Sequence, residues 1–265
     1  MQRFLAIFFL VALIIGVSAG IDTASALPLE DGAATAAEFV LGPTTPGKWG
    51  PAEMGTGATI TWSLMPDKVK YAEGSDSGKI RALEHFMPEG YLAEIQSAFD
   101  AWAAVANLTF EKVTDWGEPF NAPQLSGDIR LGGHDFDGPG GALAHGFFPP
   151  YNGVSAAGDI HFDAEEEWVI GFDDDPNTFD IFQVVVHEIG HSLGLDHVTS
   201  VVAVMNPYYS EDFRGLLESD IAGAQYLYGP SPSIASSDVP EPSTLVLLGA
   251  GFVGLLFIRR RRLKL

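Results

Sequence analysis

The 265-residue sequence lacks cysteine and is poor in basic residues. Without cysteine there can be no disulfide bond, no thiolate metal ligand and no cysteine-based inhibitory switch. Any bound metal must therefore be held by His, Asp, Glu or backbone carbonyl groups. The hydrophobic fraction of 46% is still sufficient for a folded core.

Positive charge is scarce between the two ends of the chain. Residues 27–240 contain 8 basic and 33 acidic residues, which leaves a net charge of −25. Protein contacts with phosphates need Lys and Arg, so we expect no nucleic-acid partner. An acidic body suits an exported, soluble protein, and clustered carboxylates can bind Ca²⁺.

The N-terminus predicts a secretory signal peptide over residues 1–26. Arg3 supplies the positive charge, Phe4 to Val17 is apolar, and Ala24-Ser25-Ala26 fits the small-residue cleavage pattern. An N-terminal membrane anchor is the alternative interpretation. Residues 27–47, within a stretch rich in Gly, Pro, Ala and Thr, are expected to be a linker or a short pro-segment.

The C-terminus carries a second targeting pattern. A Pro-Glu-Pro segment at residues 240–242 precedes an apolar run, Leu245 to Ile258, and four arginines, Arg259 to Arg262. The run is short of the roughly 20 residues of a stable membrane span. This order resembles the PEP-CTERM sorting signal of Gram-negative bacteria, in which an exosortase-type enzyme recognises and removes the tail. The resemblance implies export to the cell surface or beyond, with residues 241–265 as a transient membrane segment after a Ser/Pro linker at 230–240. A simple membrane anchor is the alternative.

The intervening pattern predicts one α+β domain over residues 48–229. Helices are expected at Pro88–Ala106, at Phe179–Leu193 with Asn177 or Thr178 as its cap, and at Leu217–Tyr228. Strands are expected at Ala58–Leu64, Leu108–Val113, Asp128–Leu131 and Asp159–Phe162.

The segment from His187 to His197 predicts a catalytic zinc site. A helix brings His187 and His191 onto one face, as two imidazole ligands of one ion require. Gly194 can reverse the chain and return His197 as a third ligand, which leaves one position for water. Glu188 can reach that water as a general base. Five fixed positions in H-E-x-x-H-x-x-G-x-x-H seldom arise by chance.

The extended motif, followed by Met205, resembles the metzincin clan, in which a methionine turn lies beneath the zinc. Further segments are similar to the matrixins, the matrix-metalloproteinase-like group. They are Ala98–Trp102, Leu108–Phe110, Asp128–Leu131, Phe136–His145, His161–Trp168 and Leu217–Gly229. The resemblance implies a twisted, mostly parallel five-stranded sheet with an antiparallel edge strand and three helices.

The resemblance also implies further sites. A structural zinc would be bound by His134, Asp135, His145 and His161, one calcium by Asp137, Asp163 and Glu166, and a second calcium by Asp128 and Asp159. Substrate would lie along the edge strand Ala142, Leu143 and Ala144, with Pro207 and Tyr209 in the wall of a pocket. A surface histidine at 134 and turn-capping aspartates are the alternatives.

Three departures from the matrixin pattern stand out. His134 and Asp135 are adjacent, whereas the family has one residue between these ligands. Ser219 stands where the family often has an aspartate that pairs with the mature N-terminus. The family's inhibitory cysteine is absent.

Two functions follow as hypotheses. The first is an exported, monomeric zinc endopeptidase, stabilised by calcium, that cleaves protein outside the cytoplasm. The second is a catalytically silent matrixin-fold binding module in an extracellular polymer layer.

Overall fold

The computed structural model describes residues 38–45, 47–70, 78–119, 125–149 and 156–235. The predicted signal peptide and the C-terminal sorting segment lie outside these residues. In the described part of the chain, no helix combines the length and the apolar character that a membrane crossing needs.

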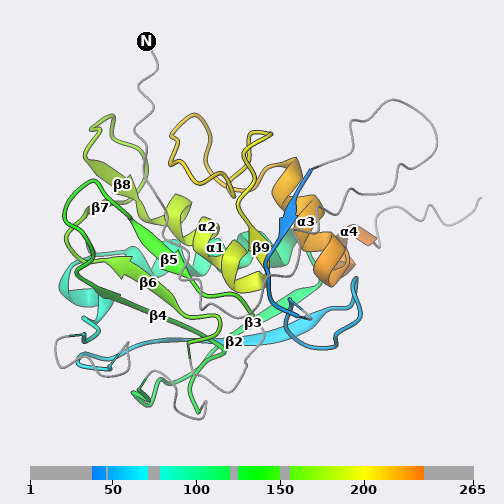
Figure 1. The fold of residues 1–265 in the computed structure, drawn as a ribbon, viewed down its shortest axis with the longest axis horizontal. Helices are drawn as coiled ribbons and strands as arrows, with labels where there is room; N and C mark the ends of the chain where they lie inside the picture. Colours follow the sequence, from blue (N-terminus) through cyan, green and yellow to red (C-terminus); the bar gives the residue numbers. More distant parts are fainter. Residues whose placement is uncertain (1–37, 46, 71–77, 120–124, 150–155, 236–265) are drawn as a thin grey trace, which may run out of the picture. The chain divides into compact units, whose positions relative to one another are not determined.

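A five-stranded sheet forms the centre of the domain in the order β3-β2-β4-β6-β5 (Figure 1). The strands are β2 (Ala58–Leu64), β3 (Leu108–Lys112), β4 (Ile129–His134), β5 (Ala144–Gly146) and β6 (Ile160–Asp163). All neighbours run parallel except β5, which pairs antiparallel with β6 at the edge. The fold class implied by the matrixin resemblance is confirmed.

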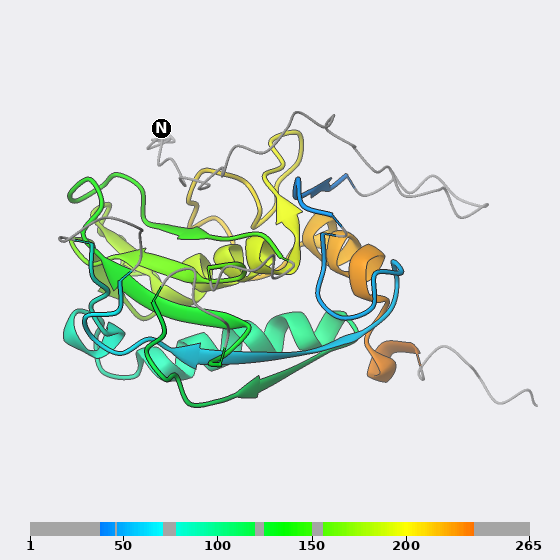
Figure 2. The ribbon, with the colours of Figure 1, turned by 60° about the horizontal axis from the view of Figure 1, so that its bottom comes forward.

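Three main helices accompany the sheet: α1 (Tyr91–Val105), α2 (Ile181–Leu193) and α3 (Glu218–Tyr228) (Figures 1 and 2). One core joins α1 and α2 to the strands, because alternate strand residues share a face of the sheet. Trp62 of β2 stacks on Phe99 of α1 with ring centroids 4.8 Å apart. Trp102 of α1 donates its indole N–H to the Val186 carbonyl of α2 at 3.1 Å. This packing fixes the helix that carries the zinc motif.

The N-terminal cap of α2 differs from the prediction. Thr178–Asp180 forms a strand, β8, that pairs with β7 (Glu167–Val169), so neither Asn177 nor Thr178 can cap the helix. Asp180 caps it instead and accepts a hydrogen bond from the Gln183 amide at 3.2 Å. The short strand was hidden because residues 178–180 continue directly into the helical pattern.

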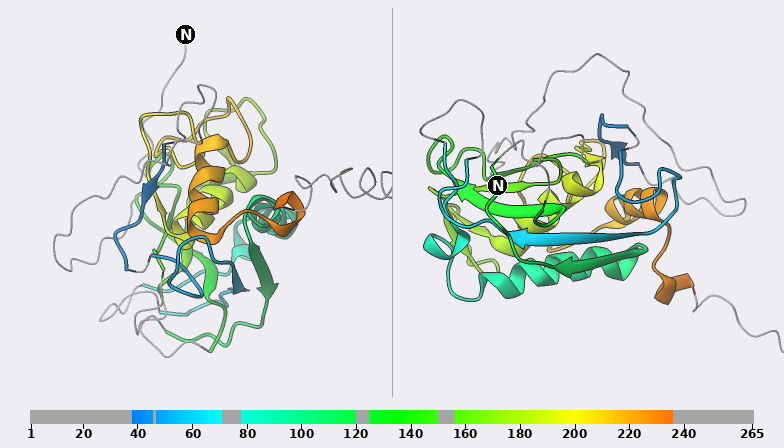
Figure 3. Two further views of the ribbon diagram at one scale, coloured as in Figure 1. Left: turned by 90° about the vertical axis from the view of Figure 1, so that its right-hand side faces the viewer. Right: turned by 90° about the horizontal axis from the view of Figure 1, so that it is seen from below.

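Ordered structure begins before residue 48, inside the segment predicted as a linker. Strand β1 (Val40–Leu41) pairs antiparallel with β9 (Leu195–Asp196). Strand β9 directly follows the zinc helix, α2, which carries His187 and His191. Phe39 is buried and contacts the ring of Tyr226 in α3. Figure 3 shows β1, in blue, beside α3. Two short elements complete the described structure: a 3₁₀ turn at Leu83–His85 and α4 at Pro232–Ala235.

Candidate metal centres

Helix α2 and the turn after it bring three imidazoles to one point. The Nε2 atoms of His187 and His191 are 3.1 Å apart, and that of His197 lies 3.3 Å and 3.1 Å from them. Zinc–nitrogen bonds of about 2.0–2.1 Å in a tetrahedron separate the nitrogens by about 3.3–3.4 Å. The predicted ligand set is therefore brought together at the spacing of a zinc site.

The hydrogen bonds of the histidines show why a cation fits between them. Nδ1 of His187 lies 2.6 Å from the Val204 carbonyl, and Nδ1 of His191 lies 2.8 Å from the Leu195 carbonyl. A carbonyl only accepts, so each Nδ1 carries the proton and each Nε2 presents a lone pair to the centre. Burial lowers the pKa of His191 to about 3 and that of His187 well below 6.5. Both rings are therefore neutral, as zinc ligands must be.

Glu188 lies next to this group and is completely buried. Neither carboxylate oxygen accepts a well-formed hydrogen bond. Burial raises the pKa of Glu188 well above its usual value, while the nearby Gly146 amide acts in the opposite direction. Gly146 belongs to the edge strand β5, so the carboxylate lies between the zinc helix and the edge strand. A buried carboxylate with unused acceptor capacity is suited to receive a proton.

Gly194 ends α2 in the left-handed conformation, with φ of 110°. Its amide bonds to the Gly190 and His191 carbonyls, and the chain then reverses into β9. A side chain here would be strained at this φ and would overlap the Gly47 carbonyl. The predicted turn that returns His197 to the group is thus present.

Met205 lies beneath the zinc helix, as the resemblance implies. A Cβ at Gly190 would overlap its sulfur, so the glycine inside the motif allows the helix to rest on Met205. Asp220 of α3 accepts hydrogen bonds from the amides of Val204 and Met205 at 2.9 and 3.1 Å. The sequence did not point to this role of Asp220, because it depends on a contact with α3 that is remote in sequence.

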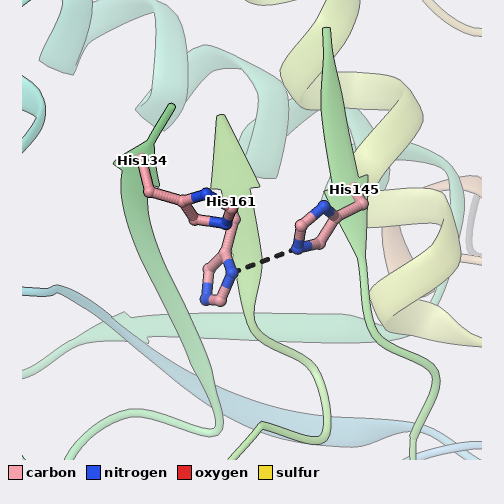
Figure 4. A group of neighbouring side chains, drawn as sticks. All are labelled: His134, His145 and His161. Atoms are coloured by element: carbon pink, nitrogen blue, oxygen red, sulfur yellow. Dashed lines mark hydrogen bonds between the residues drawn. The ribbon is translucent and has the colours of Figure 1, made fainter. Parts of the chain in front are cut away.

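A second group of histidines lies on three neighbouring strands: His134 on β4, His145 on β5 and His161 on β6 (Figure 4). Nε2 of His145 and Nδ1 of His161 are 3.1 Å apart. Six of the seven histidines in the chain thus belong to the two groups. Burial lowers the pKa of His145 to about 3, which keeps that ring neutral.

The structure does not bring Asp135 into this group. Its carboxylate bonds to the Arg81 guanidinium at 3.0 Å and is 62% exposed. Asp135 lies just beyond His134, the last residue of β4, and its carboxylate is not among the ligand atoms that come together. The described structure brings three of the four predicted ligands together.

The carboxylates of the predicted first calcium site each accept a hydrogen bond from a backbone amide. Glu166 accepts from the Gly140 amide at 2.7 Å, Asp137 from Ala142 at 3.1 Å, and Asp163 from Phe136 at 3.3 Å. The second oxygen of Asp163 is buried without a hydrogen bond. Burial and the charges of Asp163 and Asp137 raise the pKa of Glu166. Hard carboxylate oxygens are the type of ligand that Ca²⁺ prefers.

The carboxylates of the predicted second calcium site have protein partners. Asp128 accepts from the amide and the hydroxyl of Thr61 at 2.8 and 2.7 Å, which connects β4 to β2. Asp159 lies 4.0 Å from the buried guanidinium of Arg130. The same guanidinium makes two 2.9 Å bonds to Asp115. The Thr61 bonds favour the turn-capping alternative for Asp128. One oxygen of Asp159 is buried without a hydrogen bond among the described residues, so Asp159 stays a candidate ligand.

A pocket of about 900 Å³ is lined by residues between 175 and 179 and between 199 and 213, and none of the three histidines is among them. Tyr209 lines it as the resemblance implies, whereas Pro207 is not among its lining residues. A smaller pocket that also contacts Tyr209 reaches His187. Of the predicted edge residues, Ala144 lies in β5, while Ala142 and Leu143 come just before it.

The loop that forms this pocket is tied to α2 by residues that the sequence did not single out. Arg214 donates to the buried Asp180 at 2.7 Å, and Gly215 donates to the side chain of Gln183 at 2.9 Å. Asp180 and Gln183 belong to the first turn of the zinc helix. The pocket wall and the zinc ligands are therefore held by one element.

An α+β domain with three such histidines, a neighbouring glutamate and a methionine turn defines a metzincin-type zinc protein. Comparison with family models supports this class, because residues 80–229 match the Matrixin model of peptidase family M10. The chain belongs to the matrixin family. Residues 238–262 match the PEP-CTERM protein-sorting motif.

Characterised relatives agree with this assignment. The chain is 40% identical to interstitial collagenase of Sus scrofa over 149 residues, which cover 56% of this chain and 30% of the collagenase. It is 40% identical to human matrix metalloproteinase-16 over 163 residues, 56% of this chain and 25% of that protein. With human matrix metalloproteinase-17 the identity is 33% over 189 residues, 68% of this chain and 31% of that protein. The chain thus spans less than a third of the length of these relatives.

Proposed function

We propose that the protein is an exported zinc-dependent metalloendopeptidase. The observation that carries this proposal is the convergence of three Nε2 atoms within 3.1–3.3 Å beside a buried carboxylate. His187, His191 and His197 hold the zinc, and Glu188 is the catalytic base. A silent binding module would retain the fold but would have no use for a buried glutamate beside the metal ligands.

When bound, zinc acidifies a water molecule and polarises the scissile carbonyl. Glu188 accepts the proton of the attacking water on its carboxylate and then delivers it to the leaving amine. Its burial strengthens this role, because a desolvated carboxylate has a raised proton affinity. The carbonyls of Val204 and Leu195 hold His187 and His191 in the orientation that ligation requires.

A peptide substrate adds to the free edge of β5. This strand is the last in the sheet order, and an extended chain can pair with it through main-chain hydrogen bonds. Ala142, Leu143 and Ala144 provide this edge. The pocket at Tyr209 receives the side chain that follows the scissile bond.

Further metal ions stabilise the monomeric domain. Zinc is bound by His134, His145 and His161, and calcium by Asp137, Asp163 and Glu166. Asp163 supports the calcium assignment, since its buried oxygen makes no hydrogen bond within the protein. The large excess of carboxylates argues against nucleic acid as a partner.

The terminal segments direct export. Residues 1–26 act as a signal peptide, and an exosortase-type enzyme recognises the PEP-CTERM motif near the C-terminus. The peptidase domain then acts outside the cytoplasm or at the cell surface of a Gram-negative bacterium.

Metal removal tests this function. The full chain is expected to cleave casein, to lose that activity completely in excess chelator, and to regain it when zinc is returned together with calcium. Calcium alone is expected to restore none of this activity, because Ca²⁺ prefers oxygen ligands and the catalytic site offers three neutral imidazoles. Binding of casein without cleavage by the zinc-loaded protein would favour the binding-module alternative.

A further inference from the structure

The second histidine group lies on the face of the sheet opposite the helices. His145 lies directly across from His161 in the antiparallel pair, and Gly132 is the parallel partner of His161. His134 is two residues beyond Gly132 and so shares its face. Figure 4 shows the three rings directed toward one another from β4, β5 and β6. The three side chains are therefore positioned by sheet register rather than by a loop.

Asp135 lies just after the end of β4, and its carboxylate does not join the three rings. It follows His134 directly, and its carboxylate bonds to Arg81 at 3.0 Å. Arg81 is held alongside by two backbone hydrogen bonds with Gly133, of 2.7 and 3.0 Å. A half-exposed ion pair of this kind contributes little stability, so it would not by itself outcompete a zinc ligand. The stronger evidence is the position of the ligand atoms, because those of the three histidines lie within 4.8 Å of one another and no atom of Asp135 is among them.

No carboxylate belongs to this group within the described ranges of the chain. Three neutral imidazoles leave the full charge of a divalent ion uncompensated, which favours an anion or an acidified water as the fourth ligand. The neighbouring side chains are aromatic: Phe136 stacks on His145 at 4.8 Å, and Phe147 approaches the same ring at 5.3 Å. These rings provide no competing ligand.

We infer that this site binds zinc through His134, His145 and His161 alone and takes its fourth ligand from solution. That ligand is water or a small anion. The site therefore has the exchangeable position that a four-ligand structural site lacks. Of the three histidines, His145 is only partly buried, so a ligand from solution can approach the metal on that side.

Cobalt spectroscopy of the second site tests this inference. In the full-chain variant His191→Ala, which disables the catalytic group, Co²⁺ is expected to bind with a visible spectrum, and azide is expected to shift that spectrum in a saturable way. Asp135→Asn in the same background should change the Co²⁺ affinity less than about threefold and leave the azide response intact. His145→Ala should weaken Co²⁺ binding by more than the 10–100-fold loss that is typical when a residue hydrogen-bonded to a metal ligand is removed.

Two results would overturn the inference. One is a spectrum that azide leaves unchanged, which would mean that a protein group fills the fourth position. The other is a large loss of affinity in Asp135→Asn, which would return that carboxylate to the metal. If His191→Ala fails to fold, the difference between the spectra of wild type and His145→Ala gives the same readout. None of these measurements uses proteolysis, so the inference can fail while the proposed function stands.

Discussion

Replacing Glu188 with Gln is expected to lower kcat/KM for peptide hydrolysis by about 10²–10⁴-fold, the usual contribution of a general base. Gln keeps the shape of the side chain but cannot accept the proton. Because Glu188 is not one of the three converging ligands, bound zinc should remain at the wild-type stoichiometry. Steady-state kinetics on a fluorogenic peptide and metal analysis of the same sample measure both quantities.

The matched control is Glu111→Gln, which makes the same change on the exposed surface of β3. It should leave kcat/KM unchanged. If Glu188→Gln retained wild-type kcat/KM with zinc bound, Glu188 would not be the base. Loss of zinc from this variant would instead assign the carboxylate a role in holding the metal site together.

Replacing Arg130 with Met is expected to destabilise the folded domain by about 3–5 kcal/mol, the usual effect of removing one partner of a buried ion pair. The guanidinium is 1% exposed, makes two bonds to Asp115 and lies near two further carboxylates, Glu118 and Asp159. Without it, these groups would remain buried without a cation. Urea unfolding at saturating zinc and calcium measures the loss, since bound metal also contributes to stability.

The destabilisation should depend on pH. Burial alone would raise the pKa of Asp115, but the hydrogen bonds and charge of Arg130 outweigh it and hold that pKa below its usual value. In wild type, the stabilisation of the folded state by the Arg130–Asp115 pair is therefore present at neutral pH and is lost as pH falls through the acid range. In Arg130→Met the pKa of Asp115 should rise, so the folded state binds the proton more tightly than the unfolded state. The difference between variant and wild type should then shrink toward acid pH.

Arg81→Met serves as the control for this prediction. Arg81 pairs with Asp135 at the surface, where both side chains are substantially exposed, so its loss should cost no more than about 1 kcal/mol at any pH. An equal effect of the two substitutions would contradict the view that Arg130 is an internal counter-ion.

The catalytic group could be predicted from the sequence because its geometry is local. Helical spacing places His187 and His191 on one face of α2. The turn at Gly194 then brings His197, three residues later, to the same point. The four strands and three helices could be predicted for a similar reason, since each has its own period of apolar residues. The cap at Asp180 could not, because the strand β8 that precedes it depends on pairing with β7.

Features that depend on neighbours across the sheet were harder to predict. The strand pattern around Arg130 gives no sign of its role. Its partner Asp115 lies in a loop, and Asp159 directly precedes β6. Asp135 was assigned by resemblance to a family that has one residue between these two ligands, whereas here its carboxylate pairs with Arg81. Local geometry was thus a better guide than resemblance where the sequence departs from its family.

Cleavage of a diverse peptide library by the purified full chain is the most direct test of the central claim. Mass spectrometry of the products and zinc analysis should be made on the same preparation. The account predicts internal cleavage of a subset of peptides by protein with zinc at the catalytic histidines, and none after His191→Ala. Protein that is folded, carries zinc at those histidines and leaves every peptide intact would contradict it.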